Sequence, residues 1–433
     1  MGTPRVLRAA LSLTDKRILV PVLIAQIALG LAAMMICLPS MQDWSVQLGV
    51  PQSTVQLTLS IYVLAFGATQ LVWGPMSDRL GRRPVLLTGL GLLVAGLVLA
   101  ALARDATMLI AARFVQGVGA AAGMVAARAS VQDLFEGAQR TRIQGYAGMA
   151  MGVMPPLATV VGGQVHAYIG WQANFALMAV LTAGLALVSW RVLPHRAAVA
   201  ADAAAGASAA GEEATSARSS APSSARSPAP SSWWRTTLHD YARLLREPAF
   251  VPAALVIAFT AATWYAFLGA APLVLGSYGV GPAGMGFYVM VPPLAYIGGN
   301  FVTTRLAHRA GGSALMLAGQ CCTLGGVALM MLLAAAGVHH PLAFALPLAL
   351  LGIGHGLVLP SAMVLSVGMV AGLAGAAAAL TGLLQQVLGA ASGYAVGFLD
   401  HHGPMNVGWV MLLATTLSLL SQLAVRGKAP GRG

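Results

Sequence analysis

The sequence predicts an all-α integral membrane protein with twelve transmembrane helices in two six-helix bundles. Of its 433 residues, 58% are hydrophobic and 8% are charged, whereas a soluble domain has roughly 25% charged residues. Apolar stretches of about 20 residues, the length that crosses a bilayer, recur along the whole chain. A polar interruption near the middle separates them into two sets of six. The composition therefore excludes a soluble globular protein.

The twelve predicted spans divide the chain into three parts. The first set of spans lies near 18–38, 55–75, 85–103, 108–127, 144–167 and 172–190, and the second near 250–270, 284–304, 313–336, 342–367, 375–398 and 405–425. We therefore expect an N-terminal bundle over 1–193, a cytoplasmic linker over 194–249 and a C-terminal bundle over 250–433. The linker should be disordered to about residue 232, because Ala, Ser and Pro dominate it.

Residues 233–247, the last part of the linker, mix aromatic residues, leucines and arginines. This mixture predicts an amphipathic helix on the inner membrane surface. A plain solvated linker is the alternative.

Positive charge is distributed as a membrane topology requires. If the N-terminus is cytoplasmic, every Lys and Arg falls in an inside segment except Arg104, which is outside, and Arg113, which lies within a span. Basic residues accumulate on the cytoplasmic side of membrane proteins, so both termini should be cytoplasmic. The formal net charge of +12 then reflects topology and lipid contact, and nucleic acid is excluded as a partner. The three cysteines fall inside predicted spans and indicate neither disulfides nor a metal site, so no metal or other cofactor is expected.

A charged segment at 74–84 separates the second and third spans. Its charged, glycine and proline positions are Gly74, Pro75, Asp78, Arg79, Gly81, Arg82, Arg83 and Pro84. The glycines should let the backbone turn, and Pro84 suits the first turn of the next helix. Asp78, the lone acid, should pair with an arginine or face a helix N-terminus. The segment predicts a tight charged hairpin, with Asp133 as a third charged member beside Asp78 and Arg82.

The two sets of spans echo each other. The segment 79–83 follows the second span of the first set, and the similar segment 305–309 follows the second span of the second set, with Thr304 at the position of Asp78. Gly117-Val-Gly119 in span 4 likewise matches Gly352-Ile-Gly354 in span 10. Together the echoes favour a duplicated transporter whose pathway lies between the halves.

Two spans of the first set carry unusual residues. Inserting an arginine such as Arg113 of span 4 into the bilayer costs roughly 2.5–3.5 kcal/mol, so its side chain should face a partner or water. A structural arginine bonded to helix carbonyls is one interpretation. Span 5 contains prolines and glycines that free carbonyls and bend a helix, as a gating element requires. These gating candidates are Gly152, Pro155, Pro156, Gly162 and Gly163.

These motifs resemble the major facilitator superfamily. The Gly, Asp, Gly, Arg, Arg spacing at 74–84 resembles the superfamily's loop between helices 2 and 3. We expect this segment to be a conformational-switch loop in which Asp78 and Arg82, with Asp133, hold the inner ends of the two halves together in the outward-open state. Arg113 with Gln116, Gly117 and Gly119 resembles the span-4 motif of its proton-coupled antiporters, which makes Arg113 a candidate for proton coupling. Span 5 resembles their antiporter motif, with Thr159 where the last proline belongs.

Most of 20–193 is similar to bicyclomycin-resistance-type multidrug exporters. The resemblance implies a monomeric twelve-helix facilitator fold in a bacterial cytoplasmic (inner) membrane. It also implies export of small amphipathic compounds by alternating access, with protons as the energy source.

One departure concerns energy coupling. Exporters of this type usually carry an aspartate where this chain has Met35, and no Asp or Glu falls in the middle of any predicted span. His355 in span 10 is a candidate substitute, because imidazole titrates near neutral pH; a hydrogen-bonded structural histidine is the alternative. Asp43 is a second candidate if it folds inward, with a solvated loop acid as the alternative.

The candidate substrate-binding residues are methionine, aromatic and glutamine side chains, which suit an adaptable cavity. They are Met34, Met35, Gln116, Trp264, Phe267, Met290 and Gln385. Three other functions remain open: a metabolite or amino-acid exporter, a facilitator without proton coupling, and a non-transporting membrane sensor. An enzyme is disfavoured, since no Ser/His/Asp, Cys/His or metal-ligand set is clustered in the sequence.

Overall fold

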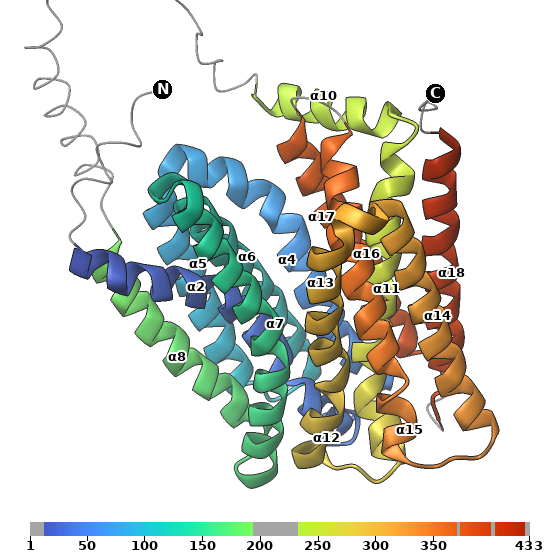
Figure 1. The fold of residues 1–433 in the computed structure, drawn as a ribbon. Helices are drawn as coiled ribbons and strands as arrows, with labels where there is room; N and C mark the ends of the chain where they lie inside the picture. Colours follow the sequence, from blue (N-terminus) through green and yellow to red (C-terminus); the bar gives the residue numbers. More distant parts are fainter. Residues whose placement is uncertain (1–12, 194–232, 370–372, 400–402, 429–433) are drawn as a thin grey trace, which may run out of the picture.

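The computed structural model describes residues 13–193, 233–369, 373–399 and 403–428, and within these ranges the chain forms helices and their connections (Figure 1). The first half comprises α2 (Leu13–Met35), η1 (Leu38–Gln42), α3 (Trp44–Gln47), α4 (Gln52–Leu80), α5 (Arg82–Ala101), α6 (Ala106–Leu134), α7 (Gly137–Tyr168) and α8 (Trp171–Val192). The second half comprises α10 (Trp233–Arg246), α11 (Phe250–Ser277), α12 (Pro282–Val289), α13 (Val291–Ala310), α14 (Gly312–Ala335), α15 (Pro341–Ala345), α16 (Leu348–Gly368), α17 (Ala374–Val396) and α18 (Met405–Lys428). The disorder expected over 194–232 lies outside the described residues.

The membrane-spanning pattern is confirmed. Ten described segments are long and apolar enough to cross a membrane, and they coincide with ten of the predicted spans. The other two predicted spans, near 144–167 and 375–398, are occupied by α7 and α17, which have 32 and 23 residues. The chain is therefore an all-α, multi-pass membrane protein.

Three spans that the sequence predicts as continuous helices are interrupted. The eighth changes from α12 to α13 at Met290, directly before Pro292 and Pro293. The tenth is divided between α15 and α16 beside Pro347, and the first ends in the short helix η1, which contains Pro39. Each break thus lies within two residues of a proline, which lacks the N–H that continues a helical ladder, although other prolines, such as Pro75, lie inside continuous helices.

The two halves repeat one packing scheme. In the first half α2 packs against α6, α7 and α8, whereas α4 and α5 pack against α6, and α5 also contacts α8. In the second half α11 packs against α16, α17 and α18, whereas α13 and α14 pack against α16, and α14 also contacts α18. Each helix of the second half thus takes the place of the helix six spans earlier.

The repeated glycines explain how the scheme is duplicated. A side chain at Gly119 would lie 2.6 Å from the carbonyl oxygen of Gly89 in α5, and one at Gly354 would collide with the carbonyl of Gly319 in α14. Gly117 approaches Tyr62 of α4 in the same way. Small residues at such crossings let membrane helices pack backbone to backbone. The matched glycines in spans 4 and 10 therefore make equivalent contacts.

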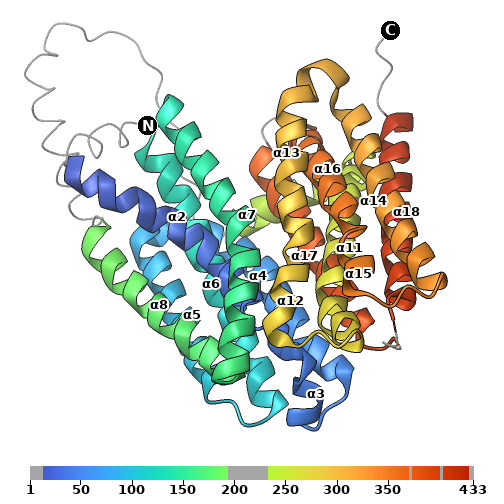
Figure 2. The same ribbon diagram turned by 60° about the horizontal axis from the view of Figure 1, so that its bottom comes forward.

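Two sets of helices form a seam between the halves: α4 with α17, and α7 with α12 and α13 (Figure 2). At one end of the molecule, the α10 end, helix α10 lies across α11 and α17. There Leu244 is buried against Phe250 and Leu380, so the helix predicted near 233–247 forms and packs on protein. The opposite end, the α12 end, carries η1, α3, α12 and α15.

Candidate functional site

The charged hairpin is formed by the junction of α4 and α5 at the α10 end. Nη1 of Arg82 donates to Asp78 and, at 3.0 Å, to the hydroxyl of Ser77. Nε of the same side chain donates to Asp133 at 2.8 Å. The guanidinium thus joins α4, α5 and the end of α6 within the first half. Arg83 turns inward and donates to the carbonyl of Trp190 at the end of α8. The structure therefore brings Asp78, Arg82 and Asp133 together.

The hairpin itself is shorter than the sequence predicts. Helix α4 continues through Gly74 and Pro75 to Leu80, and a side chain at Gly74 would meet no atom within 4 Å. The expectation that Gly74 turns the backbone is wrong. The turn occurs at Gly81, whose φ of 98° is accessible to glycine and strained for other residues.

Arg113 lies fully buried at the centre of the first half. Its guanidinium donates to the carbonyls of Ala33 and Met34 at 3.1 and 3.2 Å, and to the carbonyl of Thr58 at 3.3 Å. Because α2 ends at Met35, the carbonyls of Ala33 and Met34 belong to its last turn, where a cation is favoured by the helix dipole. This geometry matches the interpretation of Arg113 as a structural arginine bonded to helix carbonyls.

Two neighbours complete the Arg113 cluster. The guanidinium carbon lies 4.4 Å from the ring centre of Tyr62, within the range of a cation–π contact. Gln116 accepts a bond from Arg113 at 2.8 Å and donates to the carbonyl of Gly96 at 2.9 Å. Gln116 is thus engaged inside the first half, and Met34 and Met35 are also buried there.

The second half contains a separate aromatic cluster. Trp264 of α11 lies 6.2 Å from the ring of His355 in α16 and 5.6 Å from the ring of Phe267. His355 is buried, and its Nε2 has no hydrogen-bond partner. Of the remaining substrate candidates, Met290 lies at the break before α13 and Gln385 on α17, both partly exposed. The structure therefore groups Arg113 with Gln116 in the first half and Trp264 with His355 and Phe267 in the second half.

Helix α7 carries the gating candidates along one continuous helix that includes Pro155 and Pro156. Thr159 donates to the carbonyl of Pro155 at 2.9 Å. A side chain at Gly162 would collide with the carbonyl of Ile36, and one at Gly163 with the carbonyl of Pro282 in α12. An added Cβ at Gly152 would lie 3.4 Å from the side chain of Ile297 in α13. The absence of side chains at these glycines therefore lets this face of α7 contact both Ile36, which directly follows α2, and the second half.

Three glutamines of the first half, which the sequence did not single out, donate across the seam. Gln42 bonds the carbonyls of Pro272 and Val280 at 2.8 and 3.1 Å. Gln56 of α4 bonds the carbonyl of Gly269 at 2.7 Å, and Gln164 of α7 bonds that of Ala283 at 2.9 Å. These residues lie toward the α12 end of their helices. Amide-to-carbonyl bonds are short-range and uncharged, so the halves can separate there without leaving an unpaired buried ion.

Glycines bring the seam into close contact at the same end. An added Cβ at Gly397 would lie 2.6 Å from the Cα of Ser53, at the start of α4, whereas one at Gly67, in the middle of α4, would collide with the side chain of Gln386 in α17. On the other seam, a side chain at Gly286 would lie 2.5 Å from the Cα of Val160. The α12 end is therefore sealed by backbone-to-backbone contact.

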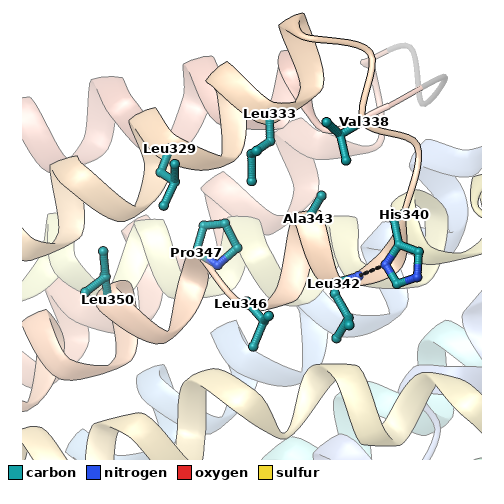
Figure 3. A pocket seen from close by; sticks show the side chains of 9 residues that line it. All are labelled: Leu329, Leu333, Val338, His340, Leu342, Ala343, Leu346, Pro347 and Leu350. Carbon is teal, nitrogen blue, oxygen red and sulfur yellow. Dashed lines mark hydrogen bonds between the residues drawn. The ribbon is translucent and has the colours of Figure 1, made fainter.

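A separate apolar groove of about 420 Å³ lies among α14, α15 and α16 (Figure 3). Its lining includes Leu329, Leu342 and Leu346, whose side chains are all partly exposed. None of the sequence-predicted site residues lines it. In a membrane-spanning chain an apolar groove of this kind suits lipid acyl chains.

Duplicated helical halves that meet along a glycine-rich seam define a membrane transporter. The sequence profile described as Major Facilitator Superfamily matches residues 22–394, so the chain belongs to that superfamily. A crystal structure of a POT family transporter in complex with a thioalcohol-conjugated peptide has the same fold, with a TM-score of 0.70 and 13% identity over 95% of this chain and 96% of that chain.

Two curated relatives resemble the chain over part of its length. The multidrug resistance protein D of Escherichia coli is 35% identical over 173 residues, 40% of this chain and 44% of that protein. A chloramphenicol resistance protein of Pseudomonas aeruginosa is 38% identical over 160 residues, 36% of this chain and 38% of that protein. The chain thus matches less than half the length of either relative, and both are named for drug resistance.

Proposed function

We propose that the protein is a secondary active transporter that exports small amphipathic compounds by alternating access, driven by protons. The observation that carries the proposal is the seam, where glycines and amide-to-carbonyl bonds hold two duplicated halves together at the α12 end. Such contacts form and break without exposing a buried charge. Membership of the superfamily and the relatives named for multidrug and chloramphenicol resistance support drugs as the substrate class.

The orientation follows from the arginines. Arg79, Arg82 and Arg83 between α4 and α5, and Arg305 and Arg309 at the end of α13, lie at the α10 end, whereas Arg104 lies between α5 and α6 at the α12 end. The positive-inside rule then makes the α10 end cytoplasmic and the α12 end the outer face of a bacterial cytoplasmic membrane. In this orientation both termini and 194–249 are cytoplasmic, and the structure is closed toward the outside.

The opposite state requires the outer seam to open and the inner ends to meet. Asp78, Arg82 and Asp133 fix the inner ends of α4, α5 and α6 relative to one another. We assign them the role of holding these ends in register when the inner face closes. The functional unit in this scheme is a monomer, because each half supplies one wall of the pathway.

Proton coupling in this chain needs a titrating group other than a helix-1 carboxylate. His355 is the candidate, because it is buried, its Nε2 has no hydrogen-bond partner, and its ring contacts that of Trp264 in α11. Imidazole is the side chain whose charge changes between pH 5 and 8. Arg113 would modulate the protonation of His355 through charge repulsion or a shared water chain.

Efflux from a bacterial strain that lacks its main exporters tests the proposal. Expression of the chain should lower accumulation of chloramphenicol and other small amphipathic compounds. Gly67→Ala, which places a methyl group against Gln386, should abolish efflux, whereas Gly91→Ala, where an added Cβ meets nothing within 4 Å, should not. A wild-type chain that moves no compound of the panel contradicts drug export.

A facilitator without proton coupling is the second candidate function, because the described spans have no carboxylate near their middles. Proteoliposomes with an imposed pH gradient separate the two functions. A proton-coupled exporter should concentrate substrate against its gradient, and His355→Gln should abolish this accumulation while substrate binding persists. Unchanged pH-driven accumulation by that variant would show that His355 is structural.

A further inference from the structure

An ion pair that the sequence does not reveal lies at the α12 end. Nε2 of His166, in the last turn of α7, lies 3.0 Å from Oδ2 of Asp43, which directly follows η1. The imidazole is 9% exposed and the carboxylate 42% exposed. Nδ1 of His166 is enclosed and has no hydrogen-bond partner. One ring nitrogen therefore contacts the Asp43 carboxylate and so links α7 to the end of η1, whereas the other ring nitrogen is enclosed without a partner.

The pair lies between two contacts to the second half. Gln42, immediately before Asp43, bonds the carbonyls of Pro272 and Val280. Gln164, two residues before His166, bonds the carbonyl of Ala283. Both ends of the ion pair are thus connected within two residues to hydrogen bonds that close the seam.

Asp43 also has a fixed anchor on its other side. Trp44 is fully buried, with its ring 5.5 Å from that of Trp171 and 6.3 Å from that of Phe175 in α8. The segment 42–44 therefore consists of a contact to the second half, an acid and an aromatic anchor. With Trp44 fixed, attraction between His166 and Asp43 sets the position from which Gln42 reaches across the seam.

Among the residues that the structure describes, few other charged groups lie near the pair. Helices α11 and α12 contain no charged residue, and Arg191 of α8 and Arg305 and Arg309 of α13 lie toward the α10 end. The described titratable groups on the adjoining elements at this end or along the seam include Cys37 before η1, Arg104 and Asp105 beside α6, Tyr168 of α7, Tyr265 of α11, Tyr278 after α11 with His339 beside it, Tyr288 of α12 and Tyr296 of α13. Asp105 caps α6 by accepting from the amide of Met108 at 2.8 Å. The imidazole of His166 therefore has Asp43 as its ionic partner.

We propose that His166 and Asp43 form a proton-binding site that closes the outer seam when the outside solution is acidic. In the protonated state the charged pair holds η1 on α7, so that Gln42 and Gln164 stay on the second half. Loss of the proton removes the charge attraction, loosens η1 and favours the open seam. The inference rests on the proposed function for its orientation, which places this site at the outer face.

The proposal assigns protons to one half of the transport cycle. An exporter that admits protons must return from the outward-open to the inward-facing state after it releases substrate. Protons that bind His166 from outside drive this return by closing the seam. Transfer of the proton to the cytoplasm is a separate step, because Asp43 remains open to the outer solution.

Distance measurements between spin labels test the site without any substrate. Labels at Val46→Cys and Ala336→Cys, both exposed and on different halves at the α12 end, would be placed in a background lacking Cys37, Cys321 and Cys322. In lipid nanodiscs the closed distance should predominate at pH 5.5, and the longer distance should increase toward pH 8.5. The open-to-closed ratio should change by about two- to fivefold, the range for one part-exposed ion pair.

Two variants and one control decide the role of the pair. His166→Gln and Asp43→Asn should each raise the open population at pH 5.5 and flatten its pH dependence. His340→Asn, at the same end, keeps an acceptor for the Leu342 amide at the start of α15 and should retain the wild-type response. Thermal unfolding of each variant confirms that it is folded.

A wild-type pH response in both folded variants would overturn the proposed site, but it would not contradict the proposed export function. A wild-type seam that does not respond to pH would also overturn it. Conversely, a pH response that is lost in both variants, in a protein that exports no compound, would support the site and contradict the proposed function.

Discussion

The first half has a buried cation bonded to carbonyls of two helices, whereas the buried polar contacts described in the second half are made by hydroxyl and amide groups. In the first half Arg113 donates hydrogen bonds to carbonyls of α2 and α4. In the second half Ser418 donates to the carbonyl of Val256 at 3.0 Å and accepts from Gln320 at 2.6 Å. In the alignment of Gly117 with Gly352, the position of Arg113 is occupied by Leu348. One packing scheme is thus completed with two different chemistries.

The difference indicates which residues establish the helix packing that both halves share, which we call the duplicated frame. The glycines at the crossings of α5 with α6 and of α14 with α16 are present in both halves and make the same close contacts. The charges at Asp78, Arg82 and Arg113 have no full counterpart in the second half, which folds in the same way without them. Glycine contacts therefore establish the duplicated frame, and the charges of the first half serve other purposes.

Replacing Arg113 with leucine, the residue at the matched position, should have the largest effect. The change removes the donor for three carbonyls and for Gln116, and each buried acceptor left unpaired costs about 1–3 kcal/mol. We expect a loss of about 3 kcal/mol or more and no efflux, measured by thermal unfolding in detergent and by expression-normalised transport. Leu348→Met in the second half should cost under about 1.5 kcal/mol.

Arg113→Lys separates charge from geometry. It keeps the cation but loses the fork of donors, so partial stability with weak efflux is expected. If Arg113→Leu instead folds and transports at half the wild-type rate, the two halves do not differ in their need for a buried cation.

Gly119→Ala and Gly354→Ala should have the next largest effect, and an equal one. Each added methyl group meets the carbonyl of a neighbouring helix, Gly89 or Gly319, and overpacking of this kind costs about 1–3 kcal/mol. Unfolding temperatures of the two variants should fall together, while Gly91→Ala should be neutral or slightly stabilising. A large loss in one half only would break the equivalence of the two frames.

The frame was largely predictable from the sequence. Hydropathy and the arginine distribution gave the spans, because lipid forces backbone groups to bond within helices of bilayer length. The matched glycines at Gly117 and Gly352 indicated the duplication, because the need for close approach leaves a local signature. The extension of α4 through Gly74 was missed, since a glycine marks a turn only where φ is positive, as at Gly81.

The site was predictable only in part. The grouping of Asp78, Arg82 and Asp133 could be predicted, because charged residues are few in this chain and a lone acid beside several arginines should pair with one of them. The partners of Asp43 and Gln42 are 123 and more than 200 residues away, at His166, Pro272 and Val280. No local pattern encodes such pairs, because they depend on how η1 meets α7 and the second half.

Removing a hydroxyl from the second-half network should have a smaller effect. Ser418→Ala leaves the buried amide of Gln320 without its acceptor at 2.6 Å, which costs about 1–2 kcal/mol. Ser189→Ala in the first half removes the acceptor of Gln26 at 2.9 Å and should cost about 1 kcal/mol. Efflux by both variants should stay near wild type once expression is matched. Loss of efflux in Ser418→Ala with an unchanged unfolding temperature would give the second-half network a transport role.

The exposed hairpin should have the smallest effect on stability and a strong effect on transport. Asp78→Asn removes one ion pair between side chains that are 66% and 26% exposed, worth under about 1 kcal/mol. Arg82 keeps its bond to Asp133, so expression and unfolding temperature should change little. Efflux should nevertheless fall strongly if Asp78 holds the inner ends of the helices when the inner face closes.

The second half supplies the matched control for Asp78. Thr304→Asp places an acid at the equivalent position, beside Arg305 and Arg309, and should not restore efflux to Asp78→Asn. Restoration would mean that either half can hold the inner gate, so that the charge difference between the halves is incidental. Wild-type efflux by Asp78→Asn alone would reduce the hairpin to a topological anchor. Strong loss without restoration would assign the switching role to the first half, on the frame that both halves share.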